Sequence, residues 1–237
     1  MKAMSFSDSH IQEGTDPEPI SALVRVAIEE RPDVVVLGGD IFDRYKSTWE
    51  DISKTEARYI LAGLTQWRAD NGLATVYIPR NHDYKAPEWL LPGAAQATSY
   101  QIPAGSPDGL PWRFMHGWEF DANWKLGPFG VSAGAFWMAT HRPELMIPLY
   151  RLMYGKQTPG KRTRSRTFRD DWTPGIEVGH TRARIYAKQE RVNLVIGHFH
   201  CPQDYDGILV DHGDLVDSYT YLILETGPVD RAELRRL

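Results

Sequence analysis

The sequence contains one cysteine, Cys201, among its 237 residues. It therefore has neither an internal disulfide nor the thiolate cluster of a structural zinc site. It also lacks any apolar run approaching the roughly 18–20 residues that a membrane-spanning helix needs. The first residues, MKAMSFSDSH, lack the apolar stretch of a secretory signal peptide. Together these absences favour a reducing compartment, and we expect a cytoplasmic protein.

The chain also lacks an extreme composition. Charged residues make up 24% and hydrophobic residues 42%, which is typical of a globular protein and excludes disordered, collagen-like and coiled-coil chains. The formal net charge of −4 is unevenly distributed, because residues 151–191 carry eleven Lys or Arg against four Asp or Glu. Such a basic segment favours contact with an anion, and equally well a solvated surface loop.

Short apolar runs alternate with helical patterns along the chain, as in α/β proteins. Apolar residues at helical spacing predict one helix over residues 20–28 and a second over residues 52–67. Between His116 and His198 the sequence changes, being apolar and aromatic first and basic after residue 156. We interpret residues 122–190 as a helical cap inserted into a single domain, 1–237. Strands are predicted before residue 8 and at residues 33–37, 75–78, 112–115, 192–196 and 217–224.

Polar side chains follow five of these strands at the point where each strand ends. Because ligands of open α/β sheets bind beyond the carboxyl ends of the strands, we expect these side chains to converge. Carboxylate, amide and imidazole donors without a thiolate suit Mn²⁺, Fe or Zn²⁺ and argue against an all-oxygen calcium site. The five segments are Asp8-Ser9-His10, Gly39-Asp40 with Asp43, Asn81-His82-Asp83, His116-Gly117 and Gly197-His198-Phe199-His200.

The order D-x-H, G-D-x-x-D, N-H-D, H, G-H-x-H resembles the calcineurin-like metallophosphoesterase superfamily, over essentially the whole chain except the cap. The resemblance implies a four-layer αββα sandwich, with two mixed sheets flanked by helices and two divalent ions between the sheets. Mn²⁺ is favoured over Fe, Zn²⁺, Ni²⁺ and Co²⁺. By this resemblance Asp40 bridges the ions, one of which takes Asp8, His10, Asp40 and His200, and the other Asp40, Asn81, His116 and His198.

The resemblance also implies roles around the ions. His82 matches the histidine that contacts the scissile phosphate or protonates the leaving group. Asp43 and Asp83 resemble residues that orient the ligands, and Asp40, His82 and Asp83 form the expected catalytic set. The implied reaction is hydrolysis of a phosphodiester or pyrophosphate bond by metal-activated hydroxide, without a covalent enzyme intermediate.

Four further residues are candidates for substrate binding. Arg80 stands where the superfamily usually has glycine, and it is either a solvent-facing variant or a contact to the substrate phosphate. Trp118 follows His116 and is a candidate to line the pocket. Arg162 and Arg164, in the basic segment, are candidates to contact an anionic substrate.

Three strings narrow the resemblance: VYIPRNHD, HGWEFD and HGDLVDSYTYLILE. They are similar to the branch that contains the UDP-diacylglucosamine pyrophosphohydrolases, which implies a nucleotide-linked lipid or sugar as substrate. In that branch the cap forms a groove for acyl chains, so peripheral membrane contact through the cap is one expectation. Packing between cap helices is the favoured explanation of these apolar residues. The chain departs from the branch at His82, where arginine is typical, and at Cys201-Pro202.

Two other functions stay open at this point. The first is a Mn²⁺-dependent nuclease, whose nucleic acid would follow the basic residues between 156 and 169. The second is a metal-bearing but inactive scaffold, which the filled ligand positions argue against. His141 and His180 are interpreted as surface or capping residues, with a position facing the cleft as the alternative for His180. His212 lies in a turn that can approach the metals but is not a matched ligand. The pattern predicts no oligomeric state.

Overall fold

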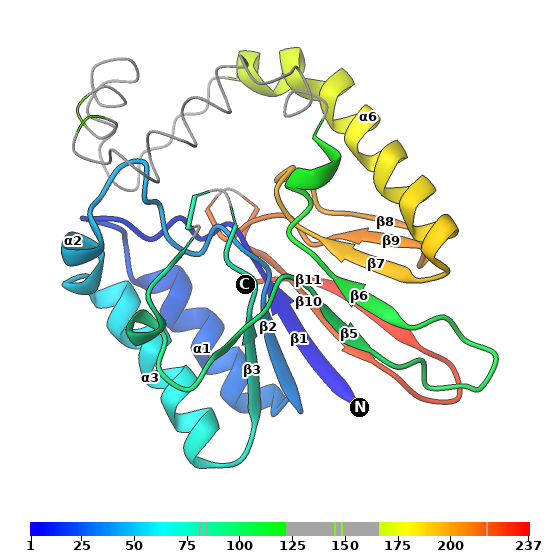
Figure 1. Cartoon of the computed structure of the whole chain (residues 1–237), viewed down its shortest axis with the longest axis horizontal. Helices are drawn as coiled ribbons and strands as arrows, with labels where there is room; N and C mark the ends of the chain where they lie inside the picture. The colour runs from blue at the N-terminus through cyan, green and yellow to red at the C-terminus, as the bar shows by residue number, and fades with distance from the viewer. Residues whose placement is uncertain (81, 84, 122–144, 146–147, 149–165, 217) are drawn as a thin grey trace.

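The computed structural model describes residues 1–80, 82–83, 85–121, 145, 148, 166–216 and 218–237. Their strands form two mixed sheets, and helices lie on the outer side of each sheet (Figure 1). The αββα layering expected from the sequence is therefore confirmed. Among these residues no helix has the length and hydropathy needed to cross a membrane.

The first sheet has six strands in the order β11-β10-β1-β2-β3-β4. Neighbouring strands from β1 to β4 run parallel, whereas β10 pairs antiparallel with both β1 and β11. The N-terminal strand thus lies inside the sheet, between β2 and a strand from near the C-terminus. The bounds are β1 (Lys2–Phe6), β2 (Val34–Leu37), β3 (Ala74–Tyr77), β4 (Ala95–Gln96), β10 (Thr220–Glu225) and β11 (Arg231–Arg236).

The second sheet has five strands in the order β5-β6-β7-β9-β8. The central strands β6, β7 and β9 run parallel, and the two edge strands are antiparallel to their neighbours. The carboxyl ends of the three parallel strands therefore share one edge of this sheet. The bounds are β5 (Tyr100–Ile102), β6 (Trp112–Phe114), β7 (Asn193–Ile196), β8 (Gln203–Tyr205) and β9 (Leu209–Asp211).

Helices cover the outer faces of the two sheets. On the first sheet lie α1 (Glu18–Glu30), α2 (Trp49–Ser53) and α3 (Glu56–Asp70), and beside the second lies α6 (Arg166–Glu190) (Figure 1). Two short 3₁₀ turns, η1 (Glu88–Leu90) and η2 (Trp118–Phe120), follow β3 and β6 in the chain. The predicted insert at 122–190 stays a prediction, since residues 122–144, 146–147 and 149–165 lie outside the described residues.

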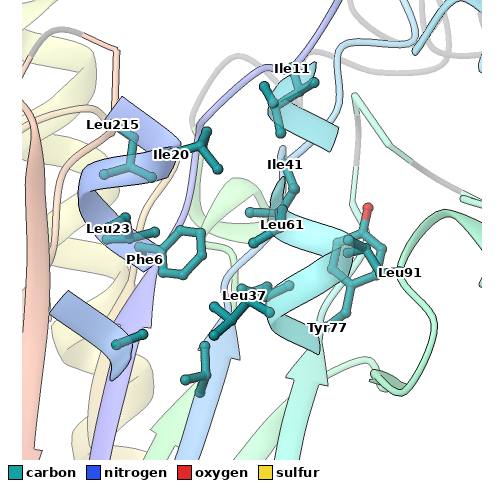
Figure 2. Close-up of a cluster of buried hydrophobic side chains, with 14 of the residues drawn as sticks. Phe6, Ile11, Ile20, Leu23, Leu37, Ile41, Leu61, Tyr77, Leu91 and Leu215 are labelled. Carbon is teal, nitrogen blue, oxygen red and sulfur yellow. The ribbon is translucent and has the colours of Figure 1, made fainter. Parts of the chain in front are cut away.

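The run VVVL in β2 is apolar throughout because both of its faces are buried. Val34 and Val36 point between the sheets, where they belong to a cluster with β6 and β7 side chains. Val35 and Leu37 point the other way, against α1 and α3. Figure 2 shows this outer cluster, in which Leu37 lies with Phe6, Leu23 and Leu61. Each such side chain contributes about 1.5–3 kcal/mol when fully buried.

The same alternation of side chains along a strand packs α6 against the second sheet. Leu194 and Ile196 of β7 pack with Ala183 and Ala187 of the helix, while Val195 faces the interior between the sheets. The two alanines are fully buried, so the helix axis can approach the sheet closely. This contact places the last four turns of α6 directly behind the strand that leads to His198 and His200.

One predicted helix is two helices in the structure, so the single helix over residues 52–67 is wrong. The chain breaks at Lys54 and Thr55, and the Thr55 hydroxyl accepts a hydrogen bond from the Arg58 amide to cap α3. Thr48 and Asp51 form a capping box at the start of α2. Two adjacent capping sequences override the continuous apolar spacing here. Strands β4, β5, β8, β9 and β11 were also not predicted.

Candidate metal centre

Six predicted ligands lie together at the carboxyl ends of the strands of both sheets. Asp8 and His10 follow β1, Asp40 follows β2, His116 follows β6, and His198 and His200 follow β7. Their donor atoms form trios within 4.8 Å of one another, namely Asp8-His10-His200 and Asp40-His116-His198. A third trio, His10-Asp40-His82, joins the first two. These groupings contain the residues of the two ligand sets implied by the resemblance, except that Asp40 is absent from the first trio and Asn81 lies outside the described residues.

Five of these residues adopt a left-handed backbone conformation that is uncommon outside glycine. The φ angles are 54° for Asp8, 46° for His10, 50° for Asp40, 66° for His198 and 54° for His200. Backbone bonds brace the first segments, because the Asp8 and His10 amides donate to the carbonyls of residues 39 and 40 at 3.0 Å. The sharp turns direct side chains from neighbouring strands into one place.

Gly39 and Gly197 leave the room that these turns need. Gly39 has a φ of 101°, and a Cβ there would lie 2.7 Å from Cδ2 of the His116 ring. A Cβ on Gly197 would overlap Ser7 Oγ and would lie 2.5 Å from Asp8 Oδ2. Glycine at both positions is therefore required by the close packing of the ligands themselves.

The two buried carboxylates of the centre have opposite electrostatic environments. Burial opposes ionisation of Asp8, but His200 and His116 outweigh it and hold the pKa of Asp8 well below its usual range. Burial raises the pKa of Asp40 well above its usual range, and the neighbouring Asp8 and Asp83 raise it further. Two carboxylates crowded into one buried site repel each other, and a divalent cation between them removes that repulsion.

The imidazoles face these carboxylates at distances that leave room for an ion. His116 Nε2 lies 3.4 Å from Asp8 Oδ1 and 3.4 Å from Asp40 Oδ2, and His200 Nε2 lies 3.4 Å from Asp8 Oδ1. The buried Nδ1 of His116 has no hydrogen-bond partner among the described residues. Carboxylate oxygen with imidazole nitrogen is a donor set that suits Mn²⁺, Fe and Zn²⁺. The residues present therefore fit a divalent metal pair.

His200 shows how strongly the site favours positive charge. Burial lowers the pKa of this imidazole, but Asp8 and Asp214 outweigh burial and raise the pKa to about 9. Asp214 Oδ2 lies 2.9 Å from His200 Nδ1 and carries no prediction from the sequence. It stands in the turn HGD after β9, and that turn was assigned no role. A bound cation would replace the proton that this environment otherwise attracts.

His82 lies beside the ligands, and one of its ring nitrogens contacts Asp43, which is not among the predicted ligands. Its Nδ1 lies 3.1 Å from Asp43 Oδ1, and its Nε2 lies 4.0 Å from Asp40 Oδ2. Asp43 is fully buried, and burial raises its pKa, but Lys46 and His82 outweigh burial and hold the pKa well below the usual range. Lys46 Nζ lies 2.6 Å from the other Asp43 oxygen. Asp43 thus fixes the His82 ring as an ionised partner.

Asp83 is fully buried but does not join the donor trios. Its Oδ2 accepts from the Ile41 amide at 2.8 Å and from the Tyr77 hydroxyl at 2.6 Å, and its Oδ1 accepts from the Arg80 amide at 2.5 Å. Burial raises the pKa of Asp83 to about 6. The carboxyl group therefore joins the turns after β2 and β3. Its role in orienting the ligands stays a prediction.

Asp121 is a neighbour of the centre that sequence reasoning missed. Its Oδ2 lies 3.3 Å from His198 Nε2, and both side chains are largely buried. It ends the string HGWEFD, in which η2 turns the chain back towards His116. The available signal was that this carboxylate comes only five residues after the predicted ligand His116. The intervening turn is too short to place it far from the site.

The substrate-binding candidates are only partly placed. Arg80 Nε lies 3.4 Å from Glu119 Oε1, and its Nη2 donates to the Thr98 carbonyl. The solvent-facing alternative for Arg80 is therefore wrong, since its side chain is 15% exposed. Trp118 begins η2, beside His116 in the chain. Arg162 and Arg164 lie outside the described residues.

Two other histidines are buried. The surface assignment of His180 is wrong, because this residue is 2% exposed and contacts β8 and β9 from α6. The helical pattern hid this burial, since the partners Tyr205 and Asp211 lie more than twenty residues further along the chain. His212 is also buried, with Nδ1 3.4 Å from Ser7 Oγ. His141 lies outside the described residues.

Comparison with known proteins gives one family and several similar folds. The family model for calcineurin-like phosphoesterases matches residues 1–217. No curated protein sequence matches the chain significantly. Similar solved structures include YfcE, a phosphoesterase from E. coli, with 14% identity over 95% of this chain and 88% of that chain and a TM-score of 0.46. A dimetal phosphatase from Danio rerio has 11% identity over 98% of both chains and a TM-score of 0.47.

Proposed function

Because the chain belongs to the calcineurin-like phosphoesterases, we propose that it hydrolyses a phosphodiester or pyrophosphate bond with two divalent ions, of which Mn²⁺ is the first candidate. The observation that carries the proposal is the grouping of donors into Asp8-His10-His200 and Asp40-His116-His198. Asp40 also groups with His10 and His82, which supports a bridging position between the two ions. Asn81 is proposed to complete the second set.

The chemistry supplied by bound ions would be a lowered pKa of water, toward about 7, and neutralisation of the phosphoryl oxygens. The protein's own part is to hold the donor side chains in place. Asp8 and Asp40 are held in buried turns, so they need little rearrangement on binding. The buried centre also has a low effective dielectric, which strengthens its attraction for cations and for a polarised phosphoryl group.

His82 is the proposed proton donor to the leaving oxygen. The contact with ionised Asp43 favours the imidazolium form of His82, in which Nδ1–H faces Asp43 and Nε2, which faces the donor cluster, carries the proton to be transferred. The Tyr45 ring packs against the imidazole at 4.2 Å between ring centroids, and His10 contacts it edge-on at 4.7 Å. A ring held on three sides can deliver a proton along one direction, as general acid catalysis requires.

The proposed substrate class is a nucleotide-linked pyrophosphate, of a lipid or a sugar. The support is the resemblance of VYIPRNHD, HGWEFD and HGDLVDSYTYLILE to the branch that cleaves such compounds. Arg80 and Trp118 are proposed to contact the substrate, with Arg162 and Arg164 from the segment that precedes α6. We further propose that residues 1–237 form one domain with the insert at 122–190, and that the protein acts in the cytoplasm.

A substrate panel tests the proposal. The metal-free protein is reconstituted separately with Mn²⁺, Fe²⁺, Zn²⁺, Ni²⁺ and Co²⁺ and offered p-nitrophenyl phosphate, bis-p-nitrophenyl phosphate, UDP-sugars, UDP-diacylglucosamine and labelled oligonucleotides. We expect Mn²⁺-dependent cleavage of the diester and of a nucleotide-linked pyrophosphate. Asp40→Asn should abolish turnover of every substrate, and Asp70→Asn, at an exposed helix end, should leave it unchanged.

The outcomes separate the functions. Preferential cleavage of the oligonucleotide, with binding that weakens steeply as salt rises, would replace the proposal with a nuclease. Binding of two ions without turnover of any substrate would indicate the inactive scaffold. Full activity of Asp40→Asn would contradict the bridging role of Asp40.

A further inference from the structure

His180 is a buried histidine that the proposed reaction does not use. Its Nε2 lies 2.8 Å from Asp211 Oδ2 at the end of β9, and its Nδ1 lies 2.8 Å from the Tyr205 hydroxyl at the end of β8. Both contacts cross from α6 to the second sheet, on the side where Figure 1 shows the helix beside β7, β8 and β9. Asp211 is fully buried, and its other oxygen accepts from the Gly213 amide at 2.9 Å. His180 is thus fixed at both ring nitrogens.

A chain of ring contacts leads from His180 to the metal centre. The His180 ring meets the Phe199 ring at 5.0 Å between centroids and 78° between planes. Phe199 in turn meets His198 at 5.1 Å and 72°, and His198 meets His116 at 5.0 Å and 69°. Phe199 is 4% exposed, so its ring is enclosed between the fixed histidine and the proposed ligand.

The segment that carries Phe199 needs external support. His198 and His200 on either side have positive φ, and the Phe199 amide donates to the Gly197 carbonyl at 2.7 Å in a tight turn. Non-glycine residues keep such conformations only where their surroundings fix them. On one side the Asp8 carboxylate accepts from the His198 amide at 2.9 Å. On the other side, the support is the contact between the Phe199 ring and helix α6.

We propose that His180, held by Asp211 and Tyr205, is a positioning residue that seats Phe199 and so fixes the spacing of His198 and His200. Gly179, beside it on α6, leaves the space that the Phe199 ring occupies. A Cβ at position 179 would overlap Cζ and Cε1 of Phe199, so glycine lets the helix approach the ring. The helix at the C-terminal end of the predicted insert thereby sets the geometry of the metal-binding turn. This inference rests on the metal centre proposed above.

The test measures metal binding directly rather than turnover. Metal-free protein is titrated with Mn²⁺ and followed by electron paramagnetic resonance, which reports free Mn²⁺ and the signal of a spin-coupled pair. Gly179→Ala should weaken binding by about tenfold or more and alter the coupled signal, as loss of ligand support typically does. Gly63→Ala is the matched control, because a Cβ at that helical position meets nothing within 4 Å. It should bind as the unaltered protein does.

Two further variants keep the test decisive if Gly179→Ala fails to fold. His180→Gln and Asp211→Asn should weaken Mn²⁺ binding while circular dichroism of the metal-free protein shows the same fold. Adding Phe199→Leu to Gly179→Ala should cause little further loss, because the two changes act on one contact. Unchanged affinity and signal in folded Gly179→Ala and His180→Gln would overturn the inference. Absence of Mn²⁺ binding by the unaltered protein would instead overturn the metal centre, and this inference with it.

Discussion

Among the described residues, ten other than glycine have positive φ, and five of these are proposed metal donors. A left-handed conformation costs a non-glycine residue about 1–2 kcal/mol. The cost at Asp8 and His10 is offset by their backbone bonds to the turn after β2. At the scale of the residue, the donors are therefore carried by turns that the two sheets hold in place.

His82→Gln tests whether His82 is a general acid or a metal ligand. If His82 donates a proton, kcat should fall by about 100-fold or more, because a positioned general acid typically contributes that much. The Mn²⁺ content should remain two ions per chain, measured by plasma mass spectrometry. Because His82 also lies in the trio with His10 and Asp40, loss of one ion together with activity would identify it as a ligand.

His212 makes stability sensitive to acid. Burial lowers its pKa from 6.5 to about 4, so the unfolded chain takes up a proton at this residue before the folded protein does. The contribution of neutral His212 is therefore fully present above pH 6.5 and is lost as the pH falls towards 4. At pH 5 the loss should be about 2 kcal/mol.

Urea unfolding of the metal-free protein at pH 7 and pH 5 measures this difference. His212→Gln, which cannot take up the proton, should lose less stability over the same interval. Equal losses in the two proteins would show that other groups cause the acid sensitivity. The comparison cancels contributions from the remaining carboxylates and histidines, which are common to both proteins.

At the scale of the elements, Arg68 joins a helix to two strands. It is fully buried on α3, and it donates to the carbonyls of Pro32 and Ala74 and to the Thr75 hydroxyl. Arg68→Met should leave these acceptors without a donor and lower the free energy of unfolding by about 3 kcal/mol. Arg25→Met, at an exposed position on α1, should change it by less than about 1 kcal/mol. Thermal and urea unfolding compare the two, and equal effects would contradict the prediction.

The elements differ in how readily the sequence reveals them. Strands β2 and β7 are buried on both faces, so their continuous apolar runs predict them well. Strand β11, RAELRR, is an edge strand rich in charge, and its pairing with β10 is visible only in the fold. β8 is three residues long and mostly exposed. Elements that depend on a partner distant in the chain carry little local signal.

The candidate site follows the same rule. The donors after β1, β2, β6 and β7 were predictable because their spacing and order are local and resemble a known pattern. Asp121 and Asp214 were not, although they lie in the strings HGWEFD and HGDLVDSYTYLILE, because neither belongs to the five ligand segments and each contacts its histidine only through the fold. His180 was misassigned because its polar partners come from another layer. The geometry that supports the ligands is thus less visible in the sequence than the ligands.

At the scale of the whole molecule, the two sheets meet at the metal centre. Asp8, His10 and Asp40 follow strands of the first sheet, while His116 and His198 follow strands of the second. Bound ions should therefore stabilise the pairing of the sheets as well as each turn. At a free concentration one hundred times the dissociation constant, each ion should contribute about 2.7 kcal/mol.

Chelation should accordingly lower the melting temperature, and added Mn²⁺ should restore it in proportion to the logarithm of its concentration. Differential scanning calorimetry of the unaltered protein measures both effects. Asp40→Asn should respond much less to chelator and to Mn²⁺, because it loses the shared carboxylate. A melting temperature independent of Mn²⁺ in the unaltered protein would contradict stabilisation by bound ions.

The position of β1 between β2 and β10 has a consequence for biosynthesis. When residue 200 has just been added to the growing chain, every proposed donor has been made, yet β10, which pairs with the open edge of β1, has not. At about 5–20 residues per second, the missing strand follows within seconds. Cation loading should therefore require β10 as well as the donors, and a translation product that stops before residue 220 would carry the ligands without the strand that completes their sheet.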